Sequence, residues 1–382
     1  MRVGVSIPFT SHADWGRFLA RERGENDVPA LPQQPDAEVV GWDLALLGLI
    51  EELGYDSCWL VEHHLTPYSM MPHPLQALSF FAGATKRIGF GTMVIVLPWH
   101  DPLRIAEELT MLQYFAGDRE VVVGVGRGIA RREFTGLHVP MEESRTRFNE
   151  AIEVIKLALE EPSFSYHGEH FNYDNVELRP HPRDAAALID NLYCAWGSRA
   201  TVPIAAGYGL KPLIIAQKPW IDYREELEMF AAMSAEAGHE PAPPIAVIVC
   251  YCVDGSGSAR SDGARWMREF SEAAVLHYEL DGGHFGAVKG YEHYADPTQN
   301  LAGAAEDAYV DYHVLGAPSE CVEQIERIVE AVGPRELVFV MRFGTMPVQA
   351  AEASMRLFAQ EVLPALHALP SGTAPRSLGV SD

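Results

Sequence analysis

The chain has 382 residues, of which 53 are acidic and 29 basic, so its formal net charge is −24. A chain this acidic argues against nucleic acid or an anionic membrane as the main partner, because both attract clustered lysine and arginine. The apolar fraction of 48% is that of an ordinary globular protein, and the length suffices for one large domain or two smaller ones.

Short apolar segments rich in β-branched residues alternate with longer segments of helical period, which predicts alternating strands and helices. The expected strands are 2–7, 57–61, 88–97, 120–125, 192–195, 212–216, 245–253 and 337–342. The expected helices fall at about 37–53, 74–85, 101–116, 141–161, 198–209, 220–238, 256–278, 318–332 and 348–367. The strands are apolar on both faces, which is typical of a parallel sheet covered by helices.

This alternation predicts an α/β fold, a (β/α)8 TIM barrel, whose usual length is about 250 residues. The surplus length predicts insertions at about 8–36, 162–190 and 279–312, after the first, fourth and seventh strands. A doubly wound parallel sheet is the rival architecture. We expect one domain over residues 1–366 and a disordered tail over residues 367–382.

The cysteines and the first residues of the chain predict the cellular location of the protein. The five cysteines form no CxxC pair, so neither a disulfide framework nor a zinc ribbon is expected. We find no signal-peptide pattern at the N-terminus and no apolar run near the roughly 20 residues of a membrane helix. The sequence predicts a reduced, cytoplasmic protein.

Glu62, His63 and His64 end the second expected strand, and in a barrel such residues surround the active site. Neighbours on a strand point to opposite faces, so all three face the cavity only if the strand ends there. An imidazole that titrates near neutrality suits proton transfer or hydrogen bonding to a developing oxyanion. A structural role stays open, while a metal site is disfavoured because no further ligand stands at a recognisable spacing.

The segment from Gly124 to Gly128 follows the fourth expected strand and looks like a dinucleotide-binding loop. It fails that test, because Ile129 stands where the third glycine or alanine belongs and no acidic residue ends a following strand. Its glycines still allow close approach of the backbone to a ligand, with Arg127 as a donor to an anion.

The segment from Ala195 to Thr201 runs from the fifth expected strand into a helix, and could seat a phosphate. Ser198 could equally be a helix cap, and Arg145 could be a solvated ion-pairing residue. The histidines at 277, 284, 293 and 313 have no ligand spacing, so we expect them at the surface. The chain has neither a GxSxG elbow nor a Walker loop, which disfavours hydrolases and ATPases.

Taken together, these segments resemble the bacterial luciferase-like flavin-dependent monooxygenase family. The resemblance runs in family order from residue 1 to about residue 366. The matching segments are 58–68, 83–112, 121–137, 144–155, 194–210 and 314–347.

The resemblance implies a TIM barrel that takes reduced FMN from a separate NAD(P)H:flavin reductase. With O2 the flavin gives a C4a-peroxyflavin, which oxygenates a small, largely apolar aldehyde, ketone or activated carbon. A homodimer is the commoner state of the wider family. The resemblance places His63 as the catalytic histidine, beside Glu62 and His64. It also implies these flavin-binding residues: Met93 and Val94, at a bend that is often a cis peptide, and Arg127, Ile129, Arg145, Trp196, Gly197, Ser198 and Thr201.

Three further expectations accompany the resemblance. The insertions 8–36 and 279–312, with Trp15, Phe285, Tyr291 and Tyr294, are lid candidates. Gly126 stands where the light-emitting catalytic subunit has a cysteine. The alternatives are a deazaflavin F420-dependent oxidoreductase of the same fold, whose polyanionic cofactor would need a basic mouth, and a non-catalytic flavin-binding subunit.

Overall fold

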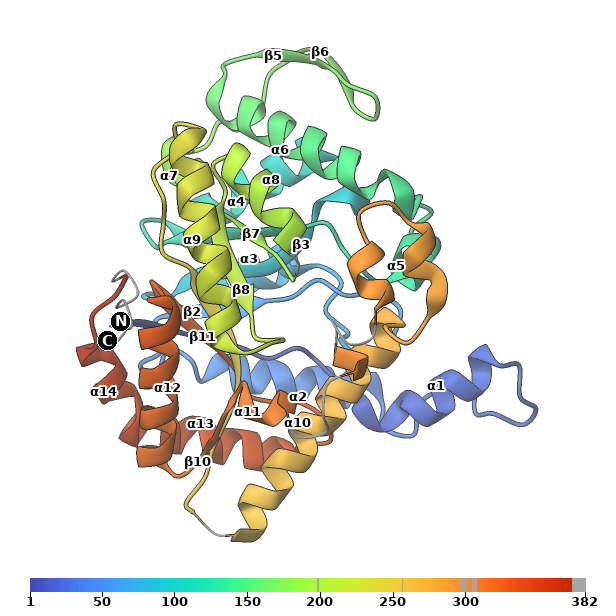
Figure 1. The fold of residues 1–382 in the computed structure, drawn as a ribbon, viewed down its shortest axis with the longest axis vertical. Coiled ribbons are helices and arrows are strands. Elements are labelled where there is room, and N and C mark those ends of the chain that lie inside the picture. Colours follow the sequence, from blue (N-terminus) through green and yellow to red (C-terminus); the bar gives the residue numbers. More distant parts are fainter. Residues whose placement is uncertain (198, 256, 297–300, 304–307, 373–382) are drawn as a thin grey trace, which may run out of the picture.

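The computed structural model describes residues 1–197, 199–255, 257–296, 301–303 and 308–372. Eight parallel strands form its centre (Figure 1). They are β1 (Arg2–Ser6), β2 (Ser57–Leu60), β3 (Gly89–Val96), β4 (Val121–Gly126), β7 (Leu192–Ala195), β8 (Lys211–Ile215), β9 (Ile245–Cys252) and β11 (Glu336–Val340). Each lies within two residues of a predicted strand.

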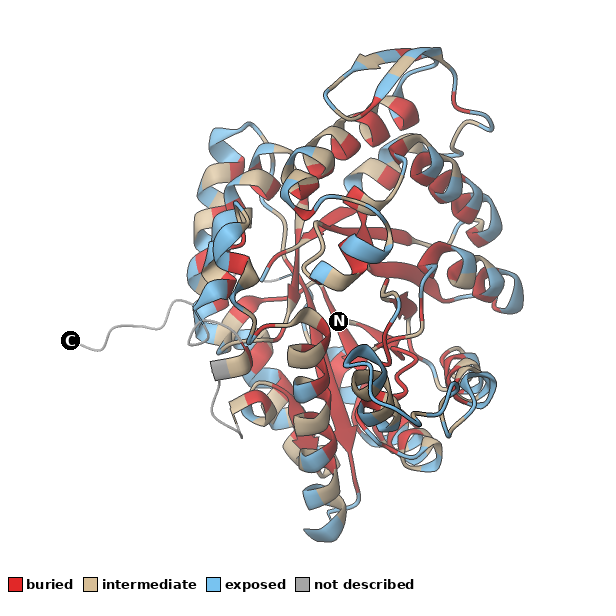
Figure 2. Ribbon diagram, turned by 90° about the vertical axis from the view of Figure 1, so that its right-hand side faces the viewer, coloured by how far each residue is buried: buried red, intermediate tan, exposed pale blue. Residues whose placement is uncertain are grey.

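The strands pair in the order β11-β1-β2-β3-β4-β7-β8, and β9 pairs with both β8 and β11. The sheet therefore closes on itself, which confirms the (β/α)8 barrel and excludes the doubly wound sheet. Nearly every strand residue is buried, whereas the helices are buried on one face only (Figure 2). This division agrees with the sequence, in which the strands are apolar on both faces.

Helices connect the strands and cover the barrel. The longer ones are α2 (Asp36–Gly48), α3 (Pro74–Ala84), α4 (Pro102–Ala116), α6 (Ser144–Glu160), α9 (Trp220–Glu236), α10 (Gly257–Tyr278), α12 (Pro318–Val332) and α13 (Val348–Glu361). Shorter ones are α1 (Trp15–Glu22), α5 (Arg131–Gly136), α7 (Ala185–Asp190), α8 (Val202–Gly207), α11 (Ala308–Asp311) and α14 (Leu363–Ala368). None of these helices is long and apolar enough to cross a membrane.

The three predicted insertions contain structure that the sequence did not predict. Residues 8–36 include α1, and residues 162–190 form an antiparallel hairpin of β5 (Phe164–His167) and β6 (Asn172–Val176) over α6 (Figure 1). Within 279–312, the described residues form 3-10 turns beside α5 and the short helix α11 (Ala308–Asp311), and a short strand β10 (Val314–Gly316) then pairs with the end of β9. These elements are too short to give a clear period.

The chain stays packed past the predicted boundary at residue 366. Helix α14 ends at Ala368, and the N-terminal amino group donates to the carbonyl oxygen of Leu369 at 2.8 Å. The Ser371 hydroxyl donates to the carbonyl oxygen of Arg335 at 2.7 Å. The predicted tail beyond these contacts, residues 373–382, lies outside the described residues.

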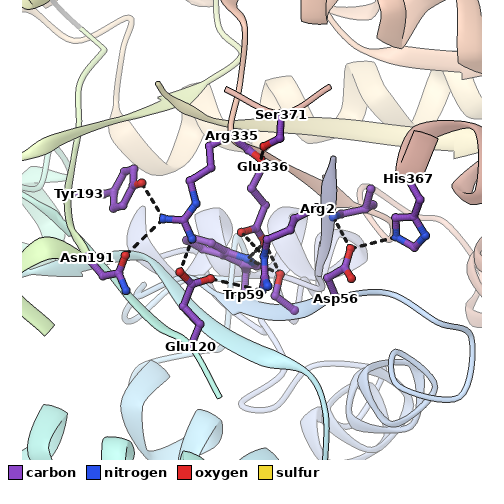
Figure 3. Close-up of polar contacts among 12 residues, drawn as sticks. Arg2, Asp56, Trp59, Glu120, Asn191, Tyr193, Arg335, Glu336, His367 and Ser371 are labelled. Carbon is purple, nitrogen blue, oxygen red and sulfur yellow. Dashed lines mark hydrogen bonds and ion pairs between the residues drawn. The ribbon is translucent and has the colours of Figure 1, made fainter. Parts of the chain in front are cut away.

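A network of paired charges closes the amino ends of the strands (Figure 3). The Glu336 carboxylate is fully buried, accepts a hydrogen bond from Trp59 Nε1 at 3.0 Å, and lies 3.4 Å from the Arg2 guanidinium. The Glu120 carboxylate forms ion pairs with Arg2 and Arg335. At this end of the barrel, each of these arginines therefore has a carboxylate partner.

Candidate active site

A cavity opens at the carboxyl ends of the barrel strands, where the sequence predicts the site. Its wall is largely apolar. The polar residues in the wall include Glu62, His63, Glu133, Arg127 and Thr201. The cavity thus offers an apolar volume whose wall contains both a histidine and an arginine.

The Glu-His-His segment does not continue strand β2, which ends at Leu60. Because the extended backbone ends there, the neighbours Glu62 and His63 both reach the cavity wall. His64 is not a wall residue, and its Nε2 lies 3.0 Å from Oε1 of Glu62. The structure therefore brings two of the three predicted residues to the cavity.

Glu62 joins the ends of two strands. Its buried carboxylate accepts hydrogen bonds from His64, from Nε2 of His100 at 2.6 Å and from the backbone N–H of Val96 at 2.8 Å. Burial alone would raise the pKa of Glu62, but the hydrogen bonds from His100 and His64 outweigh it, so the pKa lies below its ordinary value. An ionised carboxylate engaged in this way suits positioning of the strand ends better than proton exchange.

A buried glutamate that the sequence analysis missed, Glu133 of α5, lies behind His63. Its Oε1 accepts the backbone N–H of His64 at 2.7 Å and lies 3.3 Å from Nδ1 of His63 and 3.4 Å from Nε2 of His277. Burial would raise the pKa of Glu133, but the hydrogen bonds from His277 and His63 outweigh it and lower the pKa to about 2. Glu133 is therefore a buried negative charge at neutral pH.

The expectation of surface histidines is wrong for His277 and His313, which are only 0% and 3% exposed. Nδ1 of His277 lies 2.8 Å from the Thr66 hydroxyl, and its ring stacks on Tyr68 with the centroids 4.7 Å apart. Burial lowers the pKa of His277 to about 4, so this histidine is neutral. The physical reason is that one face of α10 lines the cavity and carries His277 inward at its last turn.

Two groups of side chains could hold a metal ion by distance alone. Their ligand atoms lie within 4.8 Å of one another in His63, Glu133 and His277, and in Glu150, Glu169 and His170. In both groups the carboxylate already accepts backbone N–H groups. The first group is better described as a carboxylate in contact with two imidazoles.

Arg127 of the cavity wall and Arg145 behind it, which we call the guanidinium pair, lie close enough for their charges to interact. Each has an Nη1 atom that is buried without a hydrogen-bond partner. In the part of the chain that the structure describes, no carboxylate forms an ion pair with either. Burial and then the charge of Arg127 lower the pKa of Arg145 to about 10. A partly buried pair of cations without a carboxylate partner is suited to bind a phosphate dianion.

The structure places some of the remaining predicted flavin-binding residues in the cavity wall and others outside it. Ile129, Trp196, Gly197 and Thr201 line the cavity with Arg127, whereas Arg145 stands behind the wall. Ser198 lies outside the described residues. The helix expected at 198–209 begins as a 3-10 turn, Arg199–Thr201, followed by the six residues of α8.

The bend at Met93 and Val94 lies in the cavity wall, and the peptide bond between these residues is cis. The pairing register between β3 and β4 shifts at this place. An ideal Cβ atom on Gly126 would lie 2.6 Å from Cγ2 of Val94, so a larger residue at 126 requires Val94 to move. A glycine at this position keeps the two strands in close contact.

The two lid candidates differ in what they contribute to the cavity. In the segment 279–312, Tyr294 lines the cavity. Tyr291 stacks under the Arg127 guanidinium at 3.7 Å and donates to the carbonyl oxygen of Gly128 at 2.8 Å. Phe285 is buried without reaching the wall, and Trp15 does not reach it either. The segment 279–312 is thus the one that covers the guanidinium pair.

Comparisons with known proteins show which family and fold the chain resembles. A profile of the luciferase-like monooxygenases matches residues 29–336. The alkanal monooxygenase alpha chain of Photorhabdus luminescens is 26% identical over 358 residues, which cover 88% of this chain and 94% of that protein.

Solved structures share the fold. The monooxygenase RslO1 of Streptomyces bottropensis superposes with a TM-score of 0.76 at 22% identity and covers 96% of this chain and 100% of its own. The oxygenating constituent of 3,6-diketocamphane monooxygenase from Pseudomonas putida, solved with FMN, gives 0.70 at 19% identity over 95% and 98%. The F420-dependent tetrahydromethanopterin reductase of Methanopyrus kandleri gives 0.65 at 16% identity over 96% and 99%.

Proposed function

The chain belongs to the family of luciferase-like monooxygenases, and on that premise we propose that it uses reduced FMN and O2 to oxygenate a small, largely apolar molecule. The flavin would come from a separate NAD(P)H:flavin reductase. The observation that carries the proposal is the guanidinium pair without a carboxylate partner among the described residues, at a largely apolar cavity whose wall also contains His63.

The residues present fit FMN. Arg127 and Arg145 would hold its phosphate, because their buried Nη1 atoms otherwise lack an acceptor. Burial, and after it the charge of Arg127, lowers the pKa of the neighbouring His293 to about 4, so a neutral imidazole lies beside the guanidinium pair. Thr201 and the backbone beside Gly197 would add donors, and the Met93–Val94 bend would support the ring. When bound, reduced FMN supplies the electrons that activate O2.

The chain's own groups would orient the substrate and protect the reaction. His63 is 14% exposed and faces the cavity, so it can exchange a proton with a substrate oxygen. The cavity wall that includes His63 and Arg127 also carries apolar side chains such as Val247, Val249 and Phe270, which would exclude water. These features favour an apolar carbonyl compound over a charged metabolite.

The experiment that tests this proposal mixes the protein with photoreduced FMN without oxygen, then with oxygenated buffer, while absorbance and hydrogen peroxide are followed. We expect the protein to slow flavin reoxidation, and decanal or a bicyclic ketone to divert oxygen from peroxide into product. Reoxidation identical to that of free flavin, together with tight binding of F420, would favour the F420-dependent alternative. Flavin binding without any effect on reoxidation would favour a non-catalytic subunit.

We also propose a homodimer formed through α3 and α4. Of the seven large apolar side chains that are most exposed in the described part of the chain, four lie on these two helices, which pack against each other. They are Phe80, Met111, Tyr114 and Phe115, and Phe80 is 62% exposed. An apolar patch of this kind marks an interface. Sedimentation should give a dimer for the native chain and a monomer for Phe80→Glu; a native monomer would contradict the assignment.

A further inference from the structure

Tyr278, the last residue of α10, lies beside His63 in the cavity wall. Its hydroxyl oxygen lies 3.3 Å from Nε2 of His63. Nδ1 of the same imidazole lies 3.3 Å from Oε1 of Glu133. The three side chains therefore form a continuous row, Tyr278–His63–Glu133, along the cavity wall.

The buried glutamate fixes the direction of the hydrogen bonds in this row. Glu133 is ionised and already accepts the backbone N–H of His64, so it can only accept from His63. Nδ1 of His63 must then carry the hydrogen, which leaves Nε2 as an acceptor. Tyr278 has the only hydroxyl recorded on that nitrogen among the described residues, so the hydrogen bond between them requires the hydroxyl to donate, although Tyr68 is a second partner of the same hydroxyl.

We propose that Tyr278 is a catalytic residue, the group that exchanges a proton with the reacting oxygen, and that Glu133 is a positioning residue that acts through His63. This inference rests on the proposed monooxygenase function. The order of the groups is hydroxyl, imidazole and carboxylate, which is the order by which an imidazole activates a hydroxyl elsewhere in enzymes.

The proton step balances without any co-reactant. A hydrogen on the reacting oxygen passes to the Tyr278 oxygen while the hydrogen of Tyr278 passes to Nε2 of His63. The tyrosine stays neutral, His63 becomes an imidazolium, and the negative charge of Glu133 stabilises it. The reverse step returns one proton to the oxygen of the product.

The surroundings keep the row in place. The groups that face His63 are Tyr68 from the loop after β2, Glu133 from α5, and His277 and Tyr278 from α10. His277 is neutral, so among these groups of the described chain Glu133 carries the charge. The neighbouring Thr66 holds His277 and thereby the end of α10. The Tyr278 hydroxyl is thus held against Nε2 of His63 in the cavity wall.

A spectroscopic test examines the row without turnover. Protein labelled with 15N in histidine, with the His63 signals assigned through His63→Gln, reports which ring nitrogen carries the hydrogen. We expect the hydrogen on Nδ1 in the native protein and in Tyr278→Phe, and a loss of this fixed tautomer in Glu133→Gln. A hydrogen on Nε2 in the native protein would overturn the proposal, because Tyr278 would then accept rather than donate.

A kinetic test examines the role of the hydroxyl. Tyr278→Phe should bind FMN as the native protein does but form product from decanal or a bicyclic ketone about 100-fold more slowly or less. Glu133→Gln should move the acidic limb of the pH–rate profile, which a purely structural role would leave in place. Tyr251→Phe, which removes a buried hydroxyl outside the cavity wall, is the matched control and should keep native rates.

The two tests separate this inference from the proposed function. A rate in Tyr278→Phe within about threefold of the native rate would overturn the catalytic role even if the chain is a monooxygenase. If the native protein oxygenates neither probe, the proposed function is in question, and the tautomer of His63 still decides whether the hydrogen-bonded row exists.

Discussion

The neutral state of His277 predicts a specific loss of stability in acid. The pKa of this buried histidine is lowered from 6.5 to about 4, so His277 becomes protonated at a lower pH in the folded protein than in the unfolded chain. Between these two values the unfolded chain holds more protons, so the free energy of unfolding rises with pH. The contribution of His277 is complete above about pH 6.5 and is lost as the pH falls to about 4.

The magnitude follows from the size of the shift. A difference of 2.5 units corresponds to about 3 kcal/mol, of which about 2.5 kcal/mol should vanish between about pH 7.5 and about pH 4.5. His277→Gln removes the titrating group but keeps a polar side chain. The native protein should therefore lose about 2.5 kcal/mol more than the variant over this range.

Urea unfolding of the flavin-free protein, followed by tryptophan fluorescence at several pH values, measures this difference. His167→Gln is the control, because the His167 side chain is 65% exposed, and its unfolding curves should run parallel to the native ones. If the gap between the native protein and His277→Gln is the same at every pH, His277 is not held neutral by burial and the reasoning is refuted.

Three further predictions concern the cavity and the barrel. Arg127→Met should weaken FMN binding by about 100-fold but leave riboflavin binding nearly unchanged, since only FMN carries a phosphate. Fluorescence titration with both flavins checks this. Equal weakening of both would mean that Arg127 does not contact the phosphate. His63→Ala should still bind FMN in the same titration but lose product formation by about 100-fold or more. Gly91→Ala should lower the free energy of unfolding by about 2 kcal/mol or more, because the Cβ atom of the alanine would lie 2.3 Å from a buried ring atom of Trp59. An unchanged urea midpoint would show that Trp59 has room to move.

The sequence predicted those features that depend on local pattern. Each barrel strand is an apolar run between turns, so strand positions and the closed parallel architecture followed from periodicity and count. His63 and Arg127 stand directly at strand ends, and a strand end is visible in a sequence. The ordered segments shared with a known family then linked these two residues to one cavity.

The sequence did not predict the residues that depend on long-range packing. Glu133 is 70 residues from His63, and His277 is 211 residues from Thr66, although each pair is in contact. No motif or spacing joins them, because a barrel brings them together only when it closes. His277 also resembles an ordinary residue at the end of a helix. Only the structure, in which one face of α10 points inward, shows that His277 is buried and that it lowers the pKa of Glu133.

The arginines at the two ends of the barrel differ in whether they have a carboxylate partner, and this difference supports the site independently of any resemblance. At the amino ends of the strands, Arg2 and Arg335 each lie against Glu120, so their charges are compensated within the chain. At the carboxyl ends, Arg127 and Arg145 each have a buried Nη1 atom without an acceptor. In a chain with 53 acidic residues, carboxylates are abundant, so a compensated pair would be easy to build at either end. Two partly buried guanidinium groups whose Nη1 atoms lack an acceptor cost free energy unless an anion joins them. The arrangement is therefore best explained by a phosphate-bearing ligand that completes this end of the barrel.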